Sequence, residues 1–197
     1  MRAPMKYFST PIVIVDVETT GFGPSSEVIE IGAVCLDEYG RVRSEFGALI
    51  QNQNELDHKA HNALSINNIT ETQLNNAASQ STIRAKFVDW WNAIPKETGI
   101  TAVAFNQRFD SRRLNEIGIH LPWGKCLMEM TKQVMVKHGQ TPMTNSGRRK
   151  GQVSLKEACS FLGLEYPENA HRALEDCRIT AQVACKISGF WGTERNL

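Results

Sequence analysis

The chain has 197 residues, of which 41% are hydrophobic and 22% are charged, a composition typical of a globular domain with a sizeable core. Its 22 Lys and Arg nearly balance 21 Asp and Glu, and the net charge of +1 excludes a nucleic-acid-binding protein held by overall positive charge, although not one with a local basic patch. We therefore expect a single domain over residues 1–197.

The cysteines and the N-terminal segment indicate the compartment. The five cysteines are odd in number and contain no Cys-x-x-Cys pair, which argues against a disulfide framework and against a thiolate zinc site. The N-terminal segment lacks the apolar core of a secretory signal, and no stretch approaches the roughly 18 apolar residues that a membrane helix needs. We expect a cytoplasmic protein with no membrane partner.

Three strands open the predicted fold. Ile12 to Val17 is an apolar run typical of a strand buried on both faces, and residues 28–36 (VIEIGAVCL) predict a second strand. Asp37 to Gly40 predicts a turn into a third strand over residues 41–50. These short connections predict an antiparallel meander.

From Leu56 onward the pattern becomes helical. Apolar residues recur at helical spacing between Ser79 and Pro95, so we expect a helix there, with Trp90 and Trp91 in the core. The short apolar run over residues 100–105 predicts a fourth strand, and the helix that follows it indicates a crossover connection.

The last third of the chain combines a polar loop with two helices. Residues 137–152 have no hydrophobic period and contain several Gly, which predicts a long polar loop. Helices are expected over residues 154–162 and from about 170 to 190.

Two carboxylates stand at the end of the first strand. Asp16 and Glu18 are two residues apart, so on a strand they project from the same face and repel each other. A hard cation such as Mg²⁺ or Mn²⁺ between them would remove the repulsion, whereas on a half-exposed strand both acids would simply be solvated. Thr19, Thr20 and Gly21 favour the ligand site, because Gly lets the backbone approach a ligand and the two hydroxyls stand beside it.

Two distant segments supply further candidates. Asp110 begins the helix after the fourth strand, and the stretch NAHRALEDC contains His171 and Asp176. Helical residues five positions apart lie about 140° apart around the axis, so these two could not share a helix face. We therefore expect His171 on the turn before the helix, folded back toward Asp176, where its imidazole could accept a proton from water.

These segments resemble the three motifs of the DEDDh 3′→5′ exonuclease family, which includes polymerase proofreading subunits, ribonuclease T and oligoribonuclease. The matching residues are Asp16-x-Glu18-Thr19-Thr20-Gly21, Asn106-x-x-Phe109-Asp110 and His171-x-Ala173-x-x-Asp176, with softer matches at EVIEIGAV (27–34) and NNIT (67–70). The resemblance covers roughly residues 12–184. It implies an α/β, ribonuclease H-like fold, in which helices flank a mixed central sheet made of a three-stranded antiparallel meander and parallel strands.

The resemblance also implies an activity and a set of site residues. The activity is hydrolysis of phosphodiester bonds at the 3′ end of single-stranded or frayed DNA or RNA, with release of nucleoside 5′-monophosphates. The resemblance assigns His171 as the general base and two Mg²⁺ or Mn²⁺ ions to Asp16, Glu18, Asp110 and Asp176. It assigns substrate contacts to Thr19, Thr20, Gly21, Phe22, Ile66 and Asn106.

Some positions depart from the family pattern or admit two interpretations. Some relatives have His where Phe105 and Asn67 stand, so polar contacts to the substrate are expected to differ. Arg108 could contact a phosphate or pair with a nearby acid. Basic residues near the polar loop could contact phosphate or form a solvated surface; they are Lys132, Lys137, Arg148, Arg149 and Lys150.

Other polar residues are interpreted as structural. His58 and His61 are three residues apart but have no third ligand nearby, so we expect surface histidines. Glu30 on the second strand is expected to have a structural role.

Two further functions compete with the exonuclease. One is a catalytically silent nucleic-acid-binding or polymerase-associated module, which a lost carboxylate would favour, and none is lost. The other is a phosphodiesterase for short oligonucleotides. Relatives include dimers and polymerase subunits, so the resemblance is compatible with a homodimer or with association with a polymerase. It does not decide between DNA and RNA as the substrate.

Overall fold

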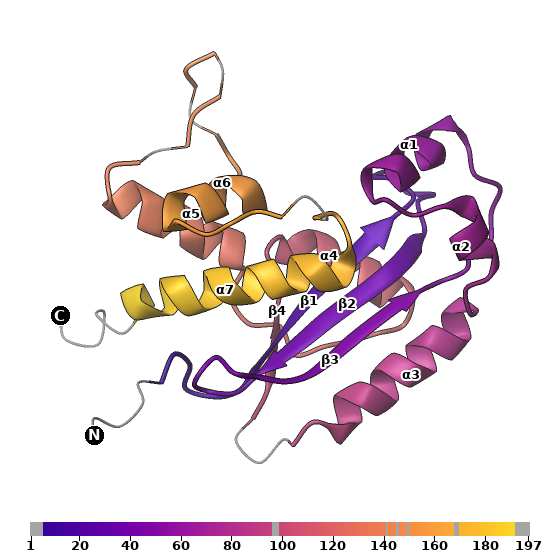
Figure 1. Cartoon of the computed structure of the whole chain (residues 1–197), viewed down its shortest axis with the longest axis horizontal. Helices are drawn as coiled ribbons and strands as arrows, with labels where there is room; N and C mark the ends of the chain where they lie inside the picture. The colour runs from indigo at the N-terminus through magenta and orange to yellow at the C-terminus, as the bar shows by residue number, and fades with distance from the viewer. Residues whose placement is uncertain are drawn as a thin grey trace.

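A mixed sheet forms the centre of the molecule, which a computed structural model describes over residues 6–95, 99–140, 142–144, 146–148, 150–167 and 170–191 (Figure 1). Within these residues the sheet has four strands in the order β3-β2-β1-β4: β1 (Ile12–Thr19), β2 (Val28–Leu36), β3 (Val42–Leu49) and β4 (Thr101–Val103). The first three strands pair antiparallel, and β4 pairs parallel to β1. This is the predicted meander with a parallel addition, although β4 is shorter than the predicted run of residues 100–105.

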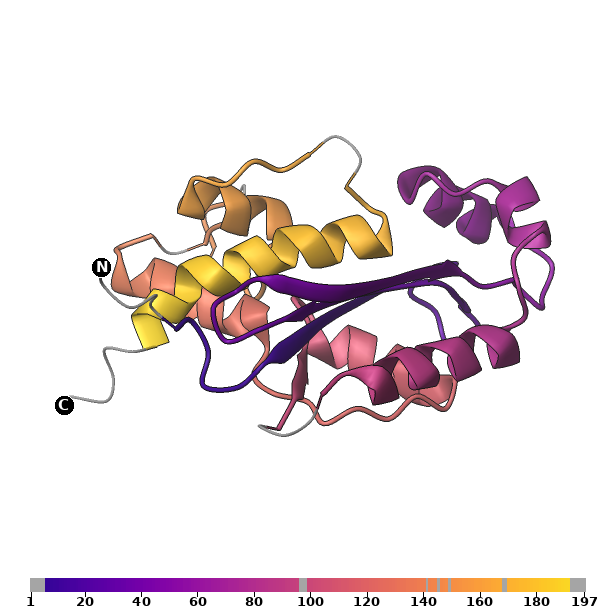
Figure 2. The ribbon, with the colours of Figure 1, turned by 60° about the horizontal axis from the view of Figure 1, so that its bottom comes forward.

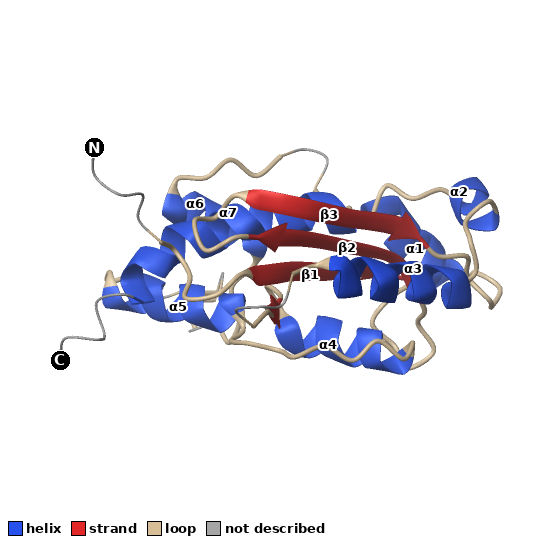
Figure 3. Ribbon diagram, turned by 90° about the horizontal axis from the view of Figure 1, so that it is seen from below, coloured by secondary structure: helices blue, strands red, loops and turns tan. Residues whose placement is uncertain are grey.

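Helices cover both faces of the sheet (Figure 2). α7 crosses one face, with α5 and α6 packed beside it, while α3 and α4 cover the other face. α1 and α2 lie at the end of the sheet where β3 ends (Figures 1 and 3). The bounds are α1 (His58–Ile66), α2 (Glu71–Asn75), α3 (Gln80–Ala93), α4 (Gln107–Glu116), α5 (Leu127–Lys137), α6 (Leu155–Leu162) and α7 (Ala173–Trp191).

The alternation of β1 divides the core into two clusters. Its residues Ile12 and Ile14 pack with α5, α6 and α7, whereas Val13, Val15 and Val17 pack with α3 and α4. Successive side chains of a strand point to opposite faces, so the carboxylates at positions 16 and 18 continue the face that α7 covers. The strand therefore carries an apolar stripe that changes to acidic residues at its C-terminal end.

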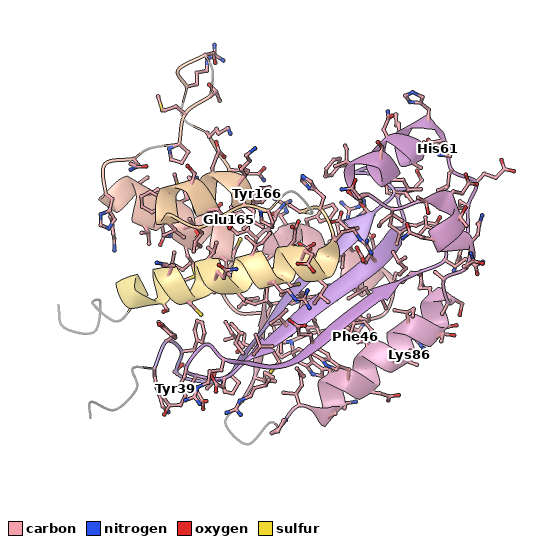
Figure 4. All side chains as sticks on the ribbon, viewed as in Figure 1. Tyr39, Phe46, His61, Lys86, Glu165 and Tyr166 are labelled. Carbon is pink, nitrogen blue, oxygen red and sulfur yellow. The ribbon has the colours of Figure 1, made fainter. Side chains whose placement is uncertain are left out.

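The amphipathic helix predicted between Ser79 and Pro95 is α3. Ser79 caps its N-terminus by accepting a hydrogen bond from the N–H of Thr82. The ring of Phe46, labelled on β3 in Figure 4, lies 5.8 Å from that of Trp90, and Trp91 is only 8% exposed. Trp91 therefore belongs to the core, as predicted, whereas Trp90 is partly buried and packs against it.

Two basic residues hold the polar segment after α5, one from the segment itself and one from α5. Lys150 donates a hydrogen bond of 2.7 Å to the carboxylate of Glu157 on α6, and Lys132 donates to the carbonyl of Gly151. Arg148 is exposed, and Arg149 lies outside the described residues. Lys150 thus has a structural partner, while Arg148 is open to solvent.

The cysteines, the histidines of α1 and the helix lengths complete the description of the fold. All five cysteines carry free thiols, and His58 and His61 are exposed on α1. Within the described part of the chain, no helix combines the length and apolar character needed to cross a membrane.

Candidate active site

Three carboxylates meet between the C-terminal end of β1 and the start of α7. Asp16 and Glu18 come from β1, and Asp176 lies in the first turn of α7. Each offers one oxygen, and these oxygens lie within 4.8 Å of one another. Residues 160 positions apart in the chain are thus brought together as the sequence motifs predict.

Burial and mutual repulsion disfavour negative charge on this cluster. Burial, followed by neighbouring carboxylates, raises the pKa of Asp16 well above its ordinary value and the pKa of Glu18 to about 8. Arg172, whose charge lowers the pKa of Glu18, is itself bound to another carboxylate. Close, desolvated carboxylate oxygens form a donor set that suits a hard divalent cation, which would favour their ionised forms.

Asp110 approaches the cluster from the first turn of α4. Its side chain is 2% exposed and accepts a hydrogen bond of 3.2 Å from the backbone N–H of Val17. Because β4 pairs with β1 only as far as Ile14, Asp110 satisfies a backbone donor beyond the end of β4. Burial raises the pKa of Asp110 to about 7. Its charge raises the pKa of Asp16, although its oxygens lie outside the group of three described above.

His171 lies on the turn before α7, where the five-residue spacing predicts it. Its φ is 73°, in the left-handed region that non-glycine residues rarely adopt. Its backbone N–H donates to Oδ1 of Asp176 at 3.2 Å, and its charge lowers the pKa of Asp176 against the larger effect of burial. α7 consequently begins at Ala173 and not near position 170 as predicted, because the turn precedes it.

The imidazole of His171 lies on the exposed side of this turn. His171 is exposed, and its ring centroid is 6.4 Å from that of Tyr166, labelled on the segment between α6 and α7 in Figure 4. The ring is therefore accessible to water beside the carboxylates.

The segment after β1 is shaped by its own hydroxyl groups. The hydroxyl of Thr19 donates to the carbonyl of Gly21 at 2.7 Å, and that of Thr20 accepts from the N–H of Glu27 at 2.9 Å. Both threonines are buried, and Gly21 has a φ of 146°. The backbone N–H of Thr20 also donates to the carbonyl of Glu27 at 2.9 Å, so hydroxyl and backbone contacts together hold this loop in place.

Two large apolar side chains predicted to contact substrate are exposed. Phe22 is 92% exposed and Ile66, at the end of α1, is 60% exposed. The side chain of Asn67 donates to the carbonyl of Thr19 at 3.5 Å, which ties the end of α1 to the end of β1. Exposed apolar side chains on segments joined in this way are available to pack against a ligand.

Asn106 and Arg108 lie at the start of α4. Asn106 occupies the N-cap position without a side-chain capping bond and lines a groove with Phe105 and Lys150. Arg108 is exposed and takes part in none of the ion pairs found among the described residues, so the interpretation as a partner of a nearby acid gains no support.

Arg113 has a role that the sequence analysis missed. Its side chain is 2% exposed, and its guanidinium donates to the carbonyls of Gly23 at 2.9 Å and Ser26 at 3.1 Å. It also pairs with Glu116 and stacks on the ring of Phe109, which contacts Phe22. Arg113 thus anchors the loop that carries Phe22, and the only sequence signal is a cation at a core position of α4.

Comparisons with known proteins match this arrangement. The RNase_T family model, described as Exonuclease, matches residues 13–184. DNA polymerase III PolC-type of Thermotoga petrophila is 32% identical over 175 residues, which are 87% of this chain but 11% of that protein. Ribonuclease T of Buchnera aphidicola subsp. Schizaphis graminum is 29% identical over 203 residues, covering 91% of this chain and 83% of that protein.

A solved structure has the same fold. The nuclease domain of 3′hExo, a DEDDh family member bound to rAMP, superposes with a TM-score of 0.71 at 18% identity, covering 94% of this chain and 95% of that one. At this identity the likeness shows a shared ribonuclease H-like architecture.

Proposed function

The chain belongs to the DEDDh type of exonuclease, since the family model matches residues 13–184, and from this premise we propose that it removes nucleotides from the 3′ end of a nucleic acid. The products would be nucleoside 5′-monophosphates. The observation that carries the proposal is the convergence of Asp16, Glu18 and Asp176, with oxygens within 4.8 Å of one another, beside Asp110 and His171. Five motif residues from three separate segments thus surround one small region.

We assign one divalent cation to Asp16, Glu18 and Asp176, and a second to Asp16 and Asp110. When bound, Mg²⁺ or Mn²⁺ would supply charge neutralisation at the phosphate and lower the pKa of the attacking water. The four carboxylates would hold the cations through oxygen atoms that burial keeps poorly hydrated. The raised pKa values support this assignment, because carboxylates crowded in this way gain most from a cation.

His171 would act as the general base. Its exposed imidazole, on a turn whose N–H is bound to Asp176, would accept the proton of the attacking water. General-base catalysis contributes roughly 10²- to 10⁴-fold to a rate. We therefore expect the loss of His171 to lower the rate less than the loss of a carboxylate, because the carboxylates would hold the cations that stabilise both the attacking and the leaving oxygen.

The 3′-terminal nucleotide would lie against the loop after β1. The backbone at Thr19, Thr20 and Gly21 would contact its sugar and phosphate, and Phe22 and Ile66 would pack against its base, with Asn106 at the other side. Stacking on apolar and aromatic side chains is tolerant of sequence and suits an unpaired end. We propose a single-stranded or frayed substrate for this reason.

The relatives are compatible with either DNA or RNA as the substrate. One is named for DNA polymerase III and another for ribonuclease activity, and contacts to the 2′-hydroxyl decide such a preference. The chain spans 11% of the PolC-type protein, so we propose association with a polymerase without assigning that protein's other activities to the chain. A homodimer and a cytoplasmic location are further proposals.

One experiment tests the activity. A 5′-labelled single-stranded oligonucleotide with Mg²⁺ or Mn²⁺ should be shortened stepwise from its 3′ end, with release of mononucleotides, and EDTA should stop the reaction. A 3′-end block should prevent it, and matched DNA and RNA series of increasing length would separate an exonuclease from an enzyme for short oligonucleotides. Binding without hydrolysis by the wild-type protein, with either metal, would favour the silent module and overturn the proposal.

A further inference from the structure

Glu30 and Arg172 form an ion pair beneath the start of α7. Glu30 lies on β2 and is 5% exposed. The guanidinium of Arg172 donates to both of its carboxylate oxygens, with Nη2 to Oε1 at 2.7 Å and Nε to Oε2 at 3.1 Å. The same carboxylate accepts the backbone N–H of Ala173, the first residue of α7, at 3.0 Å. Glu30 therefore holds two consecutive residues that directly follow His171.

The register of β1 and β2 places Glu30 beside the candidate site without making it part of the carboxylate cluster. Glu18 pairs with Glu30, and Asp16 pairs with Gly32, so all four positions share the face that α7 covers. Two carboxylates directly opposite on neighbouring strands would repel each other. The oxygens of Glu30 bind Arg172 and Ala173 at the start of α7, although its charge still contributes, after burial, to the raised pKa of Glu18.

Gly32 provides the space that this contact needs. A Cβ at position 32 would lie 2.2 Å from the carbonyl carbon of Ala173 and 2.4 Å from the N of Leu174, distances that no side chain could accommodate. The start of α7 therefore rests directly on the backbone of β2. Within one face of β2, Gly32 admits the helix and Glu30 binds its first N–H.

We propose that Glu30 is a positioning residue, which acts through Arg172 and Ala173 to hold His171 and Asp176 in place for catalysis. His171 has a φ of 73°, which L side chains adopt only when their surroundings impose it. Two sets of contacts do so here, one from Asp176 to its N–H and one from Glu30 to the next two residues. The catalytic part of this inference rests on the proposed exonuclease function, whereas the positioning itself does not.

A second ion pair on α7 provides a control for a general loss of contact between this helix and the sheet. Arg178 of α7 forms a two-pronged ion pair with Glu45 of β3, at 3.0 Å and 2.6 Å. This pair also joins α7 to the sheet, but Arg178 lies nearly two helical turns after His171. Glu45→Gln therefore weakens the contact between α7 and the sheet without touching the turn.

The first test compares Glu30→Gln and Arg172→Gln with Glu45→Gln in the full chain, using the labelled oligonucleotide. Losing a residue that orients a catalytic group typically lowers activity by roughly 10- to 100-fold. We expect a kcat reduction of that order for the first two variants with KM unchanged, and wild-type kcat for Glu45→Gln. Arg172→Lys retains a charge for Glu30 and should recover part of the rate. Equal kcat for Glu30→Gln and Glu45→Gln, both folded, would overturn the proposal.

The second test does not depend on activity. Amide exchange measured by NMR on the metal-free protein should accelerate at His171 and Ala173 in both Glu30→Gln and Arg172→Gln, and remain at wild-type rates in Glu45→Gln. Unchanged exchange at these two amides would refute the positioning role. An inactive wild-type protein with the expected exchange pattern would instead refute the proposed function alone.

Discussion

The carboxylate of Asp110 accepts the backbone N–H of Val17, 93 positions away in the chain, at 3.2 Å. This bond joins the first turn of α4 to β1 just beyond the end of β4. It holds the buried carboxylate of Asp110 against Val17, the residue that follows Asp16 in β1, so the same contact that satisfies a backbone donor of β1 also places the fourth acidic side chain.

Asp110→Asn should separate folding from catalysis. The Asn side-chain oxygen can still accept a hydrogen bond from the N–H of Val17. The buried carboxyl group of Asp110 has a pKa raised to about 7, so replacing it by a neutral amide should leave thermal stability at or above the wild-type value at neutral pH. Activity should fall below detection, because Asp110 is a proposed ligand of the second cation and would lose its negative charge. Thermal unfolding and the oligonucleotide assay check both expectations, and a folded variant with wild-type kcat would contradict them.

Asp16→Asn should lower kcat more than His171→Ala. We expect the histidine variant to retain a rate roughly 10²- to 10⁴-fold below wild type, whereas the aspartate variant loses a ligand proposed for both cations. Rates for both variants at saturating Mn²⁺, with circular dichroism to confirm folding, test this order. Comparable residual rates in the two folded variants would show that the order is wrong.

The metal-free protein should lose stability as pH rises from about 5 to about 8. Glu18 and Asp110 have raised pKa values, about 8 and about 7, so the folded state binds their protons more tightly than the unfolded state. The stabilising effect of these protons is complete below the unfolded pKa values and is lost as pH rises through the folded ones.

Saturating Mg²⁺ should reduce this pH dependence, because a cation favours the ionised carboxylates. Tm measured at several pH values in EDTA and in Mg²⁺ gives the comparison. The acids with lowered pKa values titrate below this range and do not obscure it; they are Asp37, Glu45, Glu116 and Glu157. A Tm in EDTA that rises over the same pH range would contradict the expectation.

Arg113→Met should destabilise the loop that carries Phe22. The change removes the two hydrogen bonds that the guanidinium donates to the carbonyls of Gly23 and Ser26, at a cost of about 1–3 kcal/mol. We also expect a higher KM, because Phe22 is proposed to pack against the terminal base. Arg112→Met is the matched control, since Arg112 directly precedes Arg113 on α4 but its side chain is 64% exposed and pairs with Glu116. Denaturant unfolding and steady-state kinetics should separate the two variants, and equal KM values would argue against the role of Arg113.

The sequence predicted the parts of this molecule that depend on local pattern. The alternation in β1 correctly placed Asp16 and Glu18 on one face, because strand periodicity follows from backbone geometry alone. The spacing of five residues between His171 and Asp176 likewise excluded a shared helix face and led to the observed turn. The meander and α3 followed from turn residues and helical spacing.

The missed features depend on tertiary contacts. Arg113 binds carbonyls 87 and 90 positions away. A structural role was expected for Glu30, but its partners lie 142 and 143 positions away, so no local pattern reveals these contacts. The expected length of β4 was too long because Asp110, and not another strand residue, satisfies β1 beyond Ile14. Burial raises the carboxylate pKa values only once the chain is folded.

The left-handed backbone at His171 lowers the stability of the folded protein in exchange for an imidazole at this position. A glycine at this position would adopt the left-handed backbone without steric conflict, so an imidazole is retained there at the expense of heat resistance. Selection of variants for thermal stability alone should favour replacing His171 by Gly, and would yield a more stable protein without the proposed general base.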